Sequence, residues 1–400
     1  MGACVGLGGV AGPFIAAAFV SQSTWRAIFW TITSLATLAG LLVGVILPPS
    51  VRTGSTWQKL RTIDYWGLLS SSVGLILLLI PISGGGIYFE WGSPMVVSML
   101  ILGSVSMVVF IVIEWKFATM PMVPLRLFCS LPITAIISQQ FLLGIVHYSQ
   151  LYILPIYYQN VRQFSALNAA TLMIPYVMSQ SVFSILSGQY ISHYKRYGEV
   201  IWLGYTLWLV GVGLLILFNR TVQPYAIVLV LICEGAGVGL VFQPTLIAAQ
   251  AHSSKNDRAV VISVRNFARA LGGAAGLAMS PAVFSNVFYT STADLSPGLR
   301  QEIQKVNLGV PDWSKYSSEN VEHILEAYAS ASRMTFIVWV PIMASCLALC
   351  LLIKDKGLQR QEELTLRSQA PQVEGESIQS DRPPYQACDL EKSVNSNHVN

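Results

Sequence analysis

Long apolar runs separated by short polar stretches dominate the chain. A helix that crosses a bilayer needs about 20 mainly apolar residues. Ten runs reach that length, at about 2–20, 27–47, 65–83, 94–114, 132–156, 167–191, 199–218, 224–249, 261–288 and 334–353. These runs are continuously apolar, whereas the strands of a membrane barrel alternate between apolar and polar residues. The pattern therefore predicts an all-α, polytopic membrane protein with about ten transmembrane helices.

The composition supports this prediction. Charged residues make up 11% of the chain and hydrophobic residues 53%, whereas about 25% of residues are charged in soluble domains. A net charge of +4 is too small to indicate a nucleic-acid partner. The cysteines form no CxxC pair, and we expect neither a disulfide framework nor a metal site.

Lysine and arginine are unequally distributed among the loops between the runs. Loops rich in these residues tend to be cytoplasmic. The richer loops alternate along the chain and contain Arg52, Lys59 and Arg61, then Lys116 and Arg126, then Lys195 and Arg196, then Lys255 and Arg258. We therefore place these four loops inside and the polar segment 289–333 outside. The tail 354–400 falls inside, and its polar composition predicts disorder.

The sequence contains none of the GxSxG, GxxxxGK[ST] or HExxH motifs, and we expect no enzymatic activity. Pairs of small residues such as Gly272 and Gly276 predict close helix packing. In the first run, Pro13 follows Gly12. Proline inside a helix removes a backbone hydrogen bond and produces a kink, so this position suits a hinge between two states.

The segment GLGGVAGPFIAA, followed by WRAIFW, resembles the fifth helix of fourteen-helix drug:proton antiporters of the major facilitator superfamily, especially fungal efflux pumps. Their antiporter motif reads GxxxGPxxGG. Gly8, Gly12 and Pro13 match it, whereas Ala16 and Ala17 replace the final glycine pair. The stretches PLRLF, LPIYYQ, GLVFQP and DRAVVISVRNFARALGGAAGLA are similar to later segments of the same family.

The resemblance implies a major facilitator fold in which the ten runs correspond to helices five to fourteen, with an incomplete N-terminal lobe. The implied parts are the last two helices of that lobe (1–50), a cytoplasmic linker (51–64), two central inserted helices and a loop (65–131), a six-helix C-terminal lobe (132–353) that includes a long extracellular loop (289–333), and the tail (354–400). We interpret the chain as a fragment of a longer product, with a degenerate protein as the alternative.

The resemblance also implies proton-coupled export of drugs, toxins or secondary metabolites by alternating access. The expected partners are a small amphipathic organic substrate, protons and the lipid bilayer, with the proton gradient as energy source and no cofactor. We expect a monomer in the plasma membrane, with the vacuolar membrane as the alternative. A siderophore exchanger, a family member without transport of its own and a polytopic membrane enzyme remain as alternative functions.

Glu234 is the only acidic residue well inside a predicted span, near the bilayer midplane. Ionisable groups at that depth are costly unless they are used or satisfied. Glu234 is therefore a candidate for binding and releasing a proton. A protonated carboxyl that hydrogen bonds a neighbouring helix is the structural alternative.

Gln139, Gln140 and His147 lie on the run that begins the C-terminal lobe. Polar side chains in lipid should face a cavity or another helix. In the superfamily the first helix of this lobe lines the transport path, and we expect these three residues to contribute to it. Hydrogen bonds between helices are the alternative.

Arg265, Asn266 and Arg269 lie at the predicted cytoplasmic start of the run 261–288. Spacing i, i+4 places both arginines on one helix face. We expect them to form a cytoplasmic gate by pairing with an acid such as Asp257. The alternative is that the arginines extend toward lipid headgroups.

Overall fold

The computed structural model describes residues 8, 11–12, 14–16, 18–20, 22–46, 64–85, 89–117, 121–253, 257–306, 308–311, 313–353, 355 and 357. Within these residues, nine helices are long and apolar enough to cross a membrane. They are α2 (Arg26–Ile46), α4 (Tyr65–Gly84), α5 (Pro94–Lys116), α6 (Leu131–Asn160), α7 (Ala166–Tyr194), α8 (Gly198–Leu215), α9 (Pro224–Ala251), α10 (Arg258–Ser291) and α12 (Ser318–Leu349). The predicted all-α, polytopic fold is confirmed, whereas the linker 51–63, Pro13 and almost all of the tail lie outside the described residues.

The polar segment 289–333 is largely helical, although the sequence suggested a long loop. It contains the end of α10, the short helix α11 (Pro297–Val306), the 3₁₀ turn η2 (Trp313–Lys315) and the first half of α12. The hydroxyl of Ser317 caps α12 by accepting a hydrogen bond from the backbone N–H of Asn320. Hydropathy locates only the apolar part of a helix. The apolar run 334–353 therefore predicted that this helix begins at residue 334, whereas α12 begins at Ser318.

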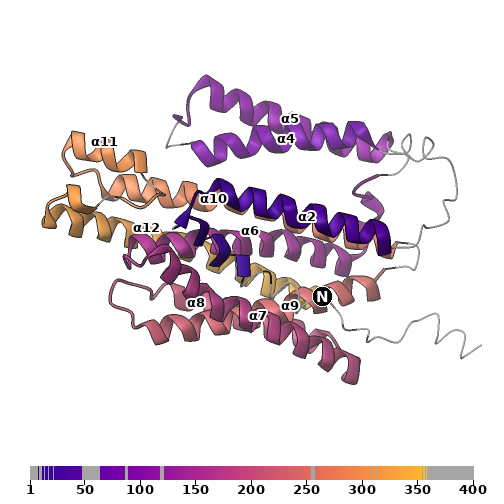
Figure 1. Cartoon of the computed structure of the whole chain (residues 1–400). Coiled ribbons are helices and arrows are strands. Elements are labelled where there is room, and N and C mark those ends of the chain that lie inside the picture. Colours follow the sequence, from indigo (N-terminus) through magenta and orange to yellow (C-terminus); the bar gives the residue numbers. More distant parts are fainter. Residues whose placement is uncertain are drawn as a thin grey trace, which may run out of the picture. The chain divides into compact units, whose positions relative to one another are not determined.

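The helices α6 to α10 and α12 pack into one bundle (Figure 1). Helices α7 and α8 both contact α9, α6 contacts α10 and α12, and α12 also contacts α8. The largest fully buried side chains, among them Trp208 and Trp339, lie in this bundle. Helix α6 contacts several neighbours and has few exposed side chains, so most of its polar residues pack against other helices.

Two helices of the bundle approach each other closely because glycines line their contact. A Cβ atom at Gly272 of α10 would lie 1.9 Å from the carbonyl oxygen of Phe141 on α6. A Cβ atom at Gly276, one turn later, would lie 2.3 Å from the carbonyl oxygen of Ile145. The predicted packing role is therefore confirmed for this pair. Around Gly8 and Gly12, by contrast, no described atom lies within 4 Å of a built Cβ.

Helices α4 and α5 form a pair that contacts the bundle through α4 and α10. The hydroxyl of Ser106 on α5 donates a hydrogen bond to the carbonyl oxygen of Ser70 on α4, at 2.8 Å. Glu114, near the end of α5, accepts hydrogen bonds from the backbone N–H groups of Met122 and Val123. This carboxylate therefore holds the chain as it turns toward η1 (Leu125–Cys129).

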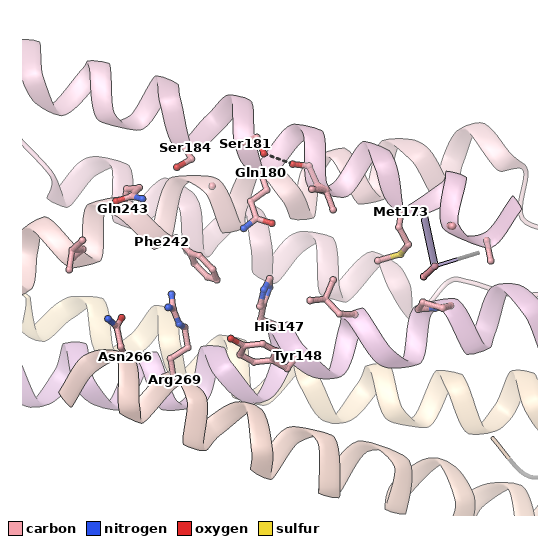
Figure 2. Close-up of a pocket in the computed structure, with 18 of the residues that line it drawn as sticks. His147, Tyr148, Met173, Gln180, Ser181, Ser184, Phe242, Gln243, Asn266 and Arg269 are labelled. Carbon is pink, nitrogen blue, oxygen red and sulfur yellow. Dashed lines mark hydrogen bonds between the residues drawn. The ribbon is translucent and has the colours of Figure 1, made fainter. Parts of the chain in front are cut away.

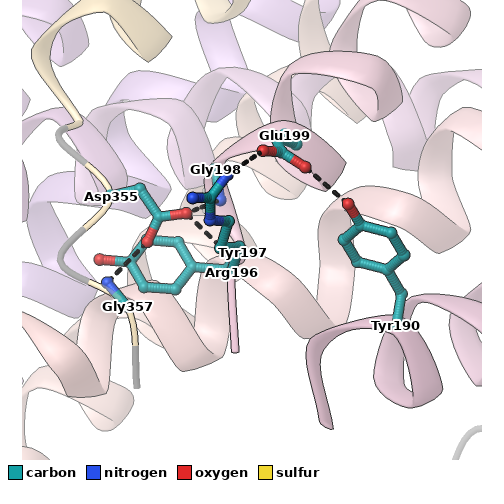
Figure 3. A network of polar contacts seen from close by, with 7 residues as sticks. All are labelled: Tyr190, Arg196, Tyr197, Gly198, Glu199, Asp355 and Gly357. Carbon is teal, nitrogen blue, oxygen red and sulfur yellow. Dashed lines mark hydrogen bonds and ion pairs between the residues drawn. The ribbon is translucent and has the colours of Figure 1, made fainter. Parts of the chain in front are cut away.

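Contacts between loops group the helix ends as the charge pattern predicted. Arg126 forms an ion pair with Asp257 at 2.7 Å, which joins two predicted inside loops. Asp355 follows η3 (Cys350–Leu352) and accepts hydrogen bonds from the backbone N–H groups of Tyr197 and Gly198 (Figure 3). At the other end of the bundle, Arg220 forms an ion pair with Glu322. Which end faces the cytoplasm stays a prediction.

Replacing Asp355 with alanine is expected to lower the stability of the bundle by about 1 kcal/mol, the usual effect of losing a helix cap. The carboxylate lies at the N-terminus of α8, where unpaired N–H groups and the helix dipole favour a negative group. Thermal unfolding of the purified chain in detergent measures the loss. The matched change Asp294→Ala removes an exposed acid after α10. An equal loss in both variants would contradict a capping role for Asp355.

Candidate functional site

A cavity of about 840 Å³ lies between α6, α7, α9 and α10. Each helix contributes side chains to its lining: His147 and Tyr148 from α6, Met173 and Gln180 from α7, Phe242 and Gln243 from α9, and Asn266 and Arg269 from α10. Figure 2 shows His147 and Arg269 pointing from one wall toward Gln180 and Phe242 on the other. Ala16 and Val20, from the first apolar run, also border the cavity.

The charged residues that line the cavity are of one sign. Arg265 and Arg269 contribute to the lining, and His147 adds an imidazole. Among the described residues that form this lining, none is aspartate or glutamate. A cavity with cationic groups and no lining acid attracts anions, because opposite charges are stabilised in a cleft with low-dielectric walls.

Arg269 is held against an aromatic ring. Its guanidinium carbon lies 5.0 Å from the centroid of Phe242 on α9. A cation–π contact of this kind contributes about 0.5–1 kcal/mol at exposed sites and leaves the charge in place. The N–H groups of Arg269 are thus oriented by the ring, and no carboxylate of the described residues forms an ion pair with them, which suits the binding of a carboxylate or phosphate group.

Arg265 lies deeper than Arg269 and is only 2% exposed. Its guanidinium donates hydrogen bonds to the carbonyl oxygen of Phe242 and to the hydroxyl of Thr245, both at 2.8 Å. It also donates to the side-chain oxygen of its neighbour Asn266 at 3.2 Å. These acceptors are all neutral, so the positive charge of Arg265 adds to that of Arg269 at the same end of the cavity.

His147 connects the cavity to the protein behind it. Its Nδ1 atom lies 3.0 Å from the hydroxyl of Tyr176 on α7. The ring also packs edge-on against Phe242, with centroids 5.0 Å apart. His147 therefore lines the cavity, and its role on a transport path stays a prediction.

Gln139 and Gln140 lie outside the lining and are fully buried between helices. Gln139 donates a hydrogen bond to the carbonyl oxygen of Cys346 on α12 at 2.8 Å. Gln140 donates to the hydroxyl of Thr245 at 3.1 Å. Both side chains therefore make the interhelical hydrogen bonds that the sequence left as their alternative, and Gln140 supports Arg265 through their shared partner.

Glu234 is fully buried behind the cavity. Its Oε1 atom accepts a hydrogen bond from the side-chain amide of Gln150 at 2.9 Å. The oxygen of the same amide accepts from the indole N–H of Trp208 at 3.3 Å. Glu234 thus joins α9 to α6 and α8.

The residues of the predicted gate lie in two places, and their role as a gate stays a prediction. Arg265, Asn266 and Arg269 do lie together at one end of the cavity. Asp257, the expected partner of the arginines, instead forms an ion pair with Arg126, while Arg265 bonds neutral acceptors on α9 and α10. In the predicted hinge, Gly8 and Gly12 face open space and Pro13 lies outside the described residues.

Sequence reasoning missed the residues that α7 and α9 contribute. Gln180, Ser181 and Ser184 of α7 line the cavity. A polar pair spaced i, i+4 such as Gln180 and Ser184 marks one helix face, and this spacing was a usable signal. Gln243 of α9 is an isolated polar residue beside Pro244, and its sequence context does not show which way it faces.

The sequence model of the Major Facilitator Superfamily matches residues 1–277. The chain belongs to this superfamily. It is 44% identical over 365 residues to Citrate exporter 1 of Yarrowia lipolytica, an alignment that covers 91% of this chain and 54% of that protein. It is 39% identical over 286 residues to the MFS-type transporter clz4 of Cochliobolus lunatus, covering 71% of this chain and 51% of the relative.

Efflux pumps of the same superfamily are also similar. Efflux pump dotC of Dothistroma septosporum is 28% identical over 284 residues, with 71% of this chain and 49% of the pump aligned. A bacterial homologue of the human lysosomal transporter Spinster, solved in an inward-facing and occupied conformation, aligns with a TM-score of 0.43 and 16% identity over 72% of this chain and 64% of that chain. This major facilitator chain spans about half the length of these curated relatives.

Membership of the superfamily confirms the family resemblance seen in the sequence. The superfamily and the named relatives are transporters, not enzymes. The chain is therefore a multi-pass membrane protein of a transporter family, as the apolar helices also indicate.

Proposed function

We propose that this major facilitator chain takes part in the proton-coupled export of a small organic acid by alternating access. The observation that carries the proposal is the cationic lining of the cavity, with Arg265 and Arg269 in the lining and no lining acid among the described residues. The similarity to a protein named as a citrate exporter supports an organic acid as the cargo. In this type of transporter, two lobes rock around a site near the midplane and expose it alternately to each side.

Proton coupling, the plasma membrane as location and a monomeric state belong to the same proposal, because the family resemblance implies them. The cavity volume of about 840 Å³ is large enough for a metabolite-sized anion, since small-molecule sites occupy roughly 300–1,000 Å³.

A neutral or cationic amphipathic compound is the second candidate cargo. Tyr148, Met173 and Phe242 give the cavity apolar and aromatic surface, and several relatives are named as efflux pumps. This surface suits drugs, toxins or secondary metabolites. The charge of the bound compound separates the two candidates, because the arginines favour an anion and disfavour a cation.

Transport by the purified full chain in liposomes tests the proposal. We expect radiolabelled citrate to cross the membrane when a pH gradient is imposed, and the flux to collapse when a protonophore dissipates the gradient. A lipophilic cation should show no protein-dependent flux under the same conditions. Protein-free liposomes provide the background. Gradient-driven flux of the cation in place of citrate, or no flux of either compound, would overturn the proposal for this chain.

A further inference from the structure

A second polar cluster lies behind the cavity, where α6, α8 and α9 meet. It consists of Gln150, Trp208 and Glu234, which are all fully buried. The amide of Gln150 bridges the other two, since it donates to Glu234 at 2.9 Å and accepts from Trp208 at 3.3 Å. The cavity lining does not include these side chains, so the cluster is not simply part of the substrate site.

The chemistry of Trp208 fixes the orientation of this network. An indole N–H can only donate a hydrogen bond, so it must meet the oxygen of the Gln150 amide. The amide nitrogen therefore faces Glu234, and Oε1 of Glu234 must act as an acceptor. This leaves Oε2 as the atom that can carry a proton. Among the described residues, Oε2 has no hydrogen-bond partner.

The helices around Glu234 are shaped to enclose its side chain. A Cβ atom at Gly211 of α8 would lie 2.3 Å from Cγ of Glu234, so a larger residue there would collide with the acid. A Cβ atom at Gly235 would lie 2.2 Å from the carbonyl oxygen of Tyr176 on α7. Glycine on both sides thus lets α7 and α8 close around the carboxyl group at this depth.

Among the described residues, the titratable groups that face Glu234 are weak acids. The hydroxyls of Tyr158 on α6 and Tyr176 on α7 interact electrostatically with it, as does the neighbouring thiol of Cys233 on α9. Helix α8 presents Gly211 and the neutral indole of Trp208. In the described part of the chain, the carboxyl of Glu234 accepts one hydrogen bond, which comes from the uncharged amide of Gln150. The carboxyl therefore has no paired cation among these residues.

Tyr176, one of the hydroxyls near Glu234, also contacts a residue of the cavity lining. Tyr176 donates to or accepts from Nδ1 of His147 at 3.0 Å, and His147 lines the cavity. His147 and Gln150 are three residues apart on α6, a spacing that places both on one helix face. An imidazole with two ring nitrogens can take a proton on one side and release it on the other.

We propose that Glu234 binds and releases the coupling proton, and that Tyr176 and His147 connect it to the cavity. The inference rests on the proposed proton-coupled function and assigns the proton to one atom of this chain, Oε2 of Glu234. An unpaired carboxylate inside a membrane protein is costly, whereas the neutral acid is not. Protonation on Oε2 leaves the hydrogen bond from Gln150 to Oε1 intact, so the network survives both states.

An anion bound beside Arg269 and His147 would repel a negative charge on Glu234. Substrate binding and proton binding are therefore linked, and each favours the other, so the anion and its proton are carried together, in contrast to the exchange that the resemblance to drug:proton antiporters implies. We expect protons to be taken up from solution when citrate is added to the purified full chain, measured with an indicator dye in weakly buffered detergent solution. The change Glu234→Gln should abolish this uptake, because the amide cannot bind the proton.

Infrared difference spectroscopy tests the protonation site without requiring transport. In the wild-type chain we expect a carbonyl-stretch band of a protonated carboxylic acid that changes with pH and is absent in Glu234→Gln. The matched control is Glu114→Gln, which alters the second buried glutamate of the described residues, 6% exposed and held by two backbone N–H groups. This control should keep the band. Tyr176→Phe should keep it too but slow its response to a pH jump, because the link to His147 is lost.

The outcomes separate this inference from the proposed function. If the titrating band disappears in Glu234→Gln although the wild-type chain neither binds nor transports citrate, the proton site stands and the proposed cargo fails. If citrate transport is proton-coupled but Glu234→Gln retains the band and the proton uptake, Glu234 is structural and the inference is overturned. If proton uptake is lost in His147→Gln but retained in Glu234→Gln, the proton binds the imidazole, and the inference about Glu234 is again overturned. An unchanged melting temperature of Glu234→Gln shows that the variant is folded.

Discussion

The change Gly272→Ala is expected to disrupt folding of the bundle. The added Cβ atom would lie 1.9 Å from the carbonyl oxygen of Phe141 and 2.8 Å from its carbonyl carbon. Both are backbone atoms, so no side chain can move aside and α10 must separate from α6. Overpacking of a core costs typically 1–3 kcal/mol, and we expect a loss of about 3 kcal/mol here. Thermal unfolding in detergent and the monodisperse fraction on gel filtration measure it.

The control for this prediction is Gly213→Ala on α8. No described atom lies within 4 Å of a Cβ built at Gly213. Alanine is favoured over glycine in helices by about 1 kcal/mol, so this variant should be at least as stable as the wild type. If Gly272→Ala unfolds at the same temperature as Gly213→Ala, α6 and α10 are farther apart than described. His147 and Arg269, which share one wall of the cavity, would then also lie farther apart.

Hydropathy predicted the membrane-spanning helices well because the bilayer imposes a length and an apolar composition on each of them. The predicted run 65–83 corresponds to α4 at Tyr65–Gly84, and the run 224–249 to α9 at Pro224–Ala251. The same signal fails where a helix leaves the apolar region. Helix α12 begins at Ser318 with a serine cap, and its first turns pack Tyr328 against Phe288 with ring centroids 4.4 Å apart. That part of the helix is stabilised by tertiary contacts that hydropathy does not measure.

The candidate site was less predictable than the fold. Composition shows that a polar residue in an apolar helix must face protein or a cavity, but it does not distinguish the two. Gln140 and His147 both lie on α6, seven residues apart, yet Gln140 bonds Thr245 in the core and His147 lines the cavity. The difference depends on which helix packs against each position. For the same reason the sequence could not show that Asp257 pairs with Arg126 in a distant loop.

The change Arg269→Gln is expected to weaken citrate binding by about 30-fold, which corresponds to roughly 2 kcal/mol. Removing one partner of a buried charge pair costs roughly 2–5 kcal/mol, and we take the lower end because the cavity also holds Arg265 and His147. Arg269→Lys should lie between the variant and the wild type, since lysine keeps the charge but cannot form the planar, two-pronged contact of arginine with a carboxylate. Equilibrium binding of radiolabelled citrate to the purified full chain measures the affinities.

Arg333→Gln provides the matched control, because it removes the same charge from an exposed position on α12 that is not part of the cavity lining. Its citrate affinity should stay within about twofold of the wild type, since exposed charges more than a Debye length of roughly 8–10 Å away are largely screened. An equal loss in Arg333→Gln and Arg269→Gln would mean that net charge, rather than a contact in the cavity, sets the affinity. Unchanged binding in Arg269→Gln would remove the arginine from the substrate site.

The change Phe242→Leu keeps the charge of Arg269 but removes the ring that orients its guanidinium. We therefore expect a smaller loss of citrate affinity in Phe242→Leu than in Arg269→Gln.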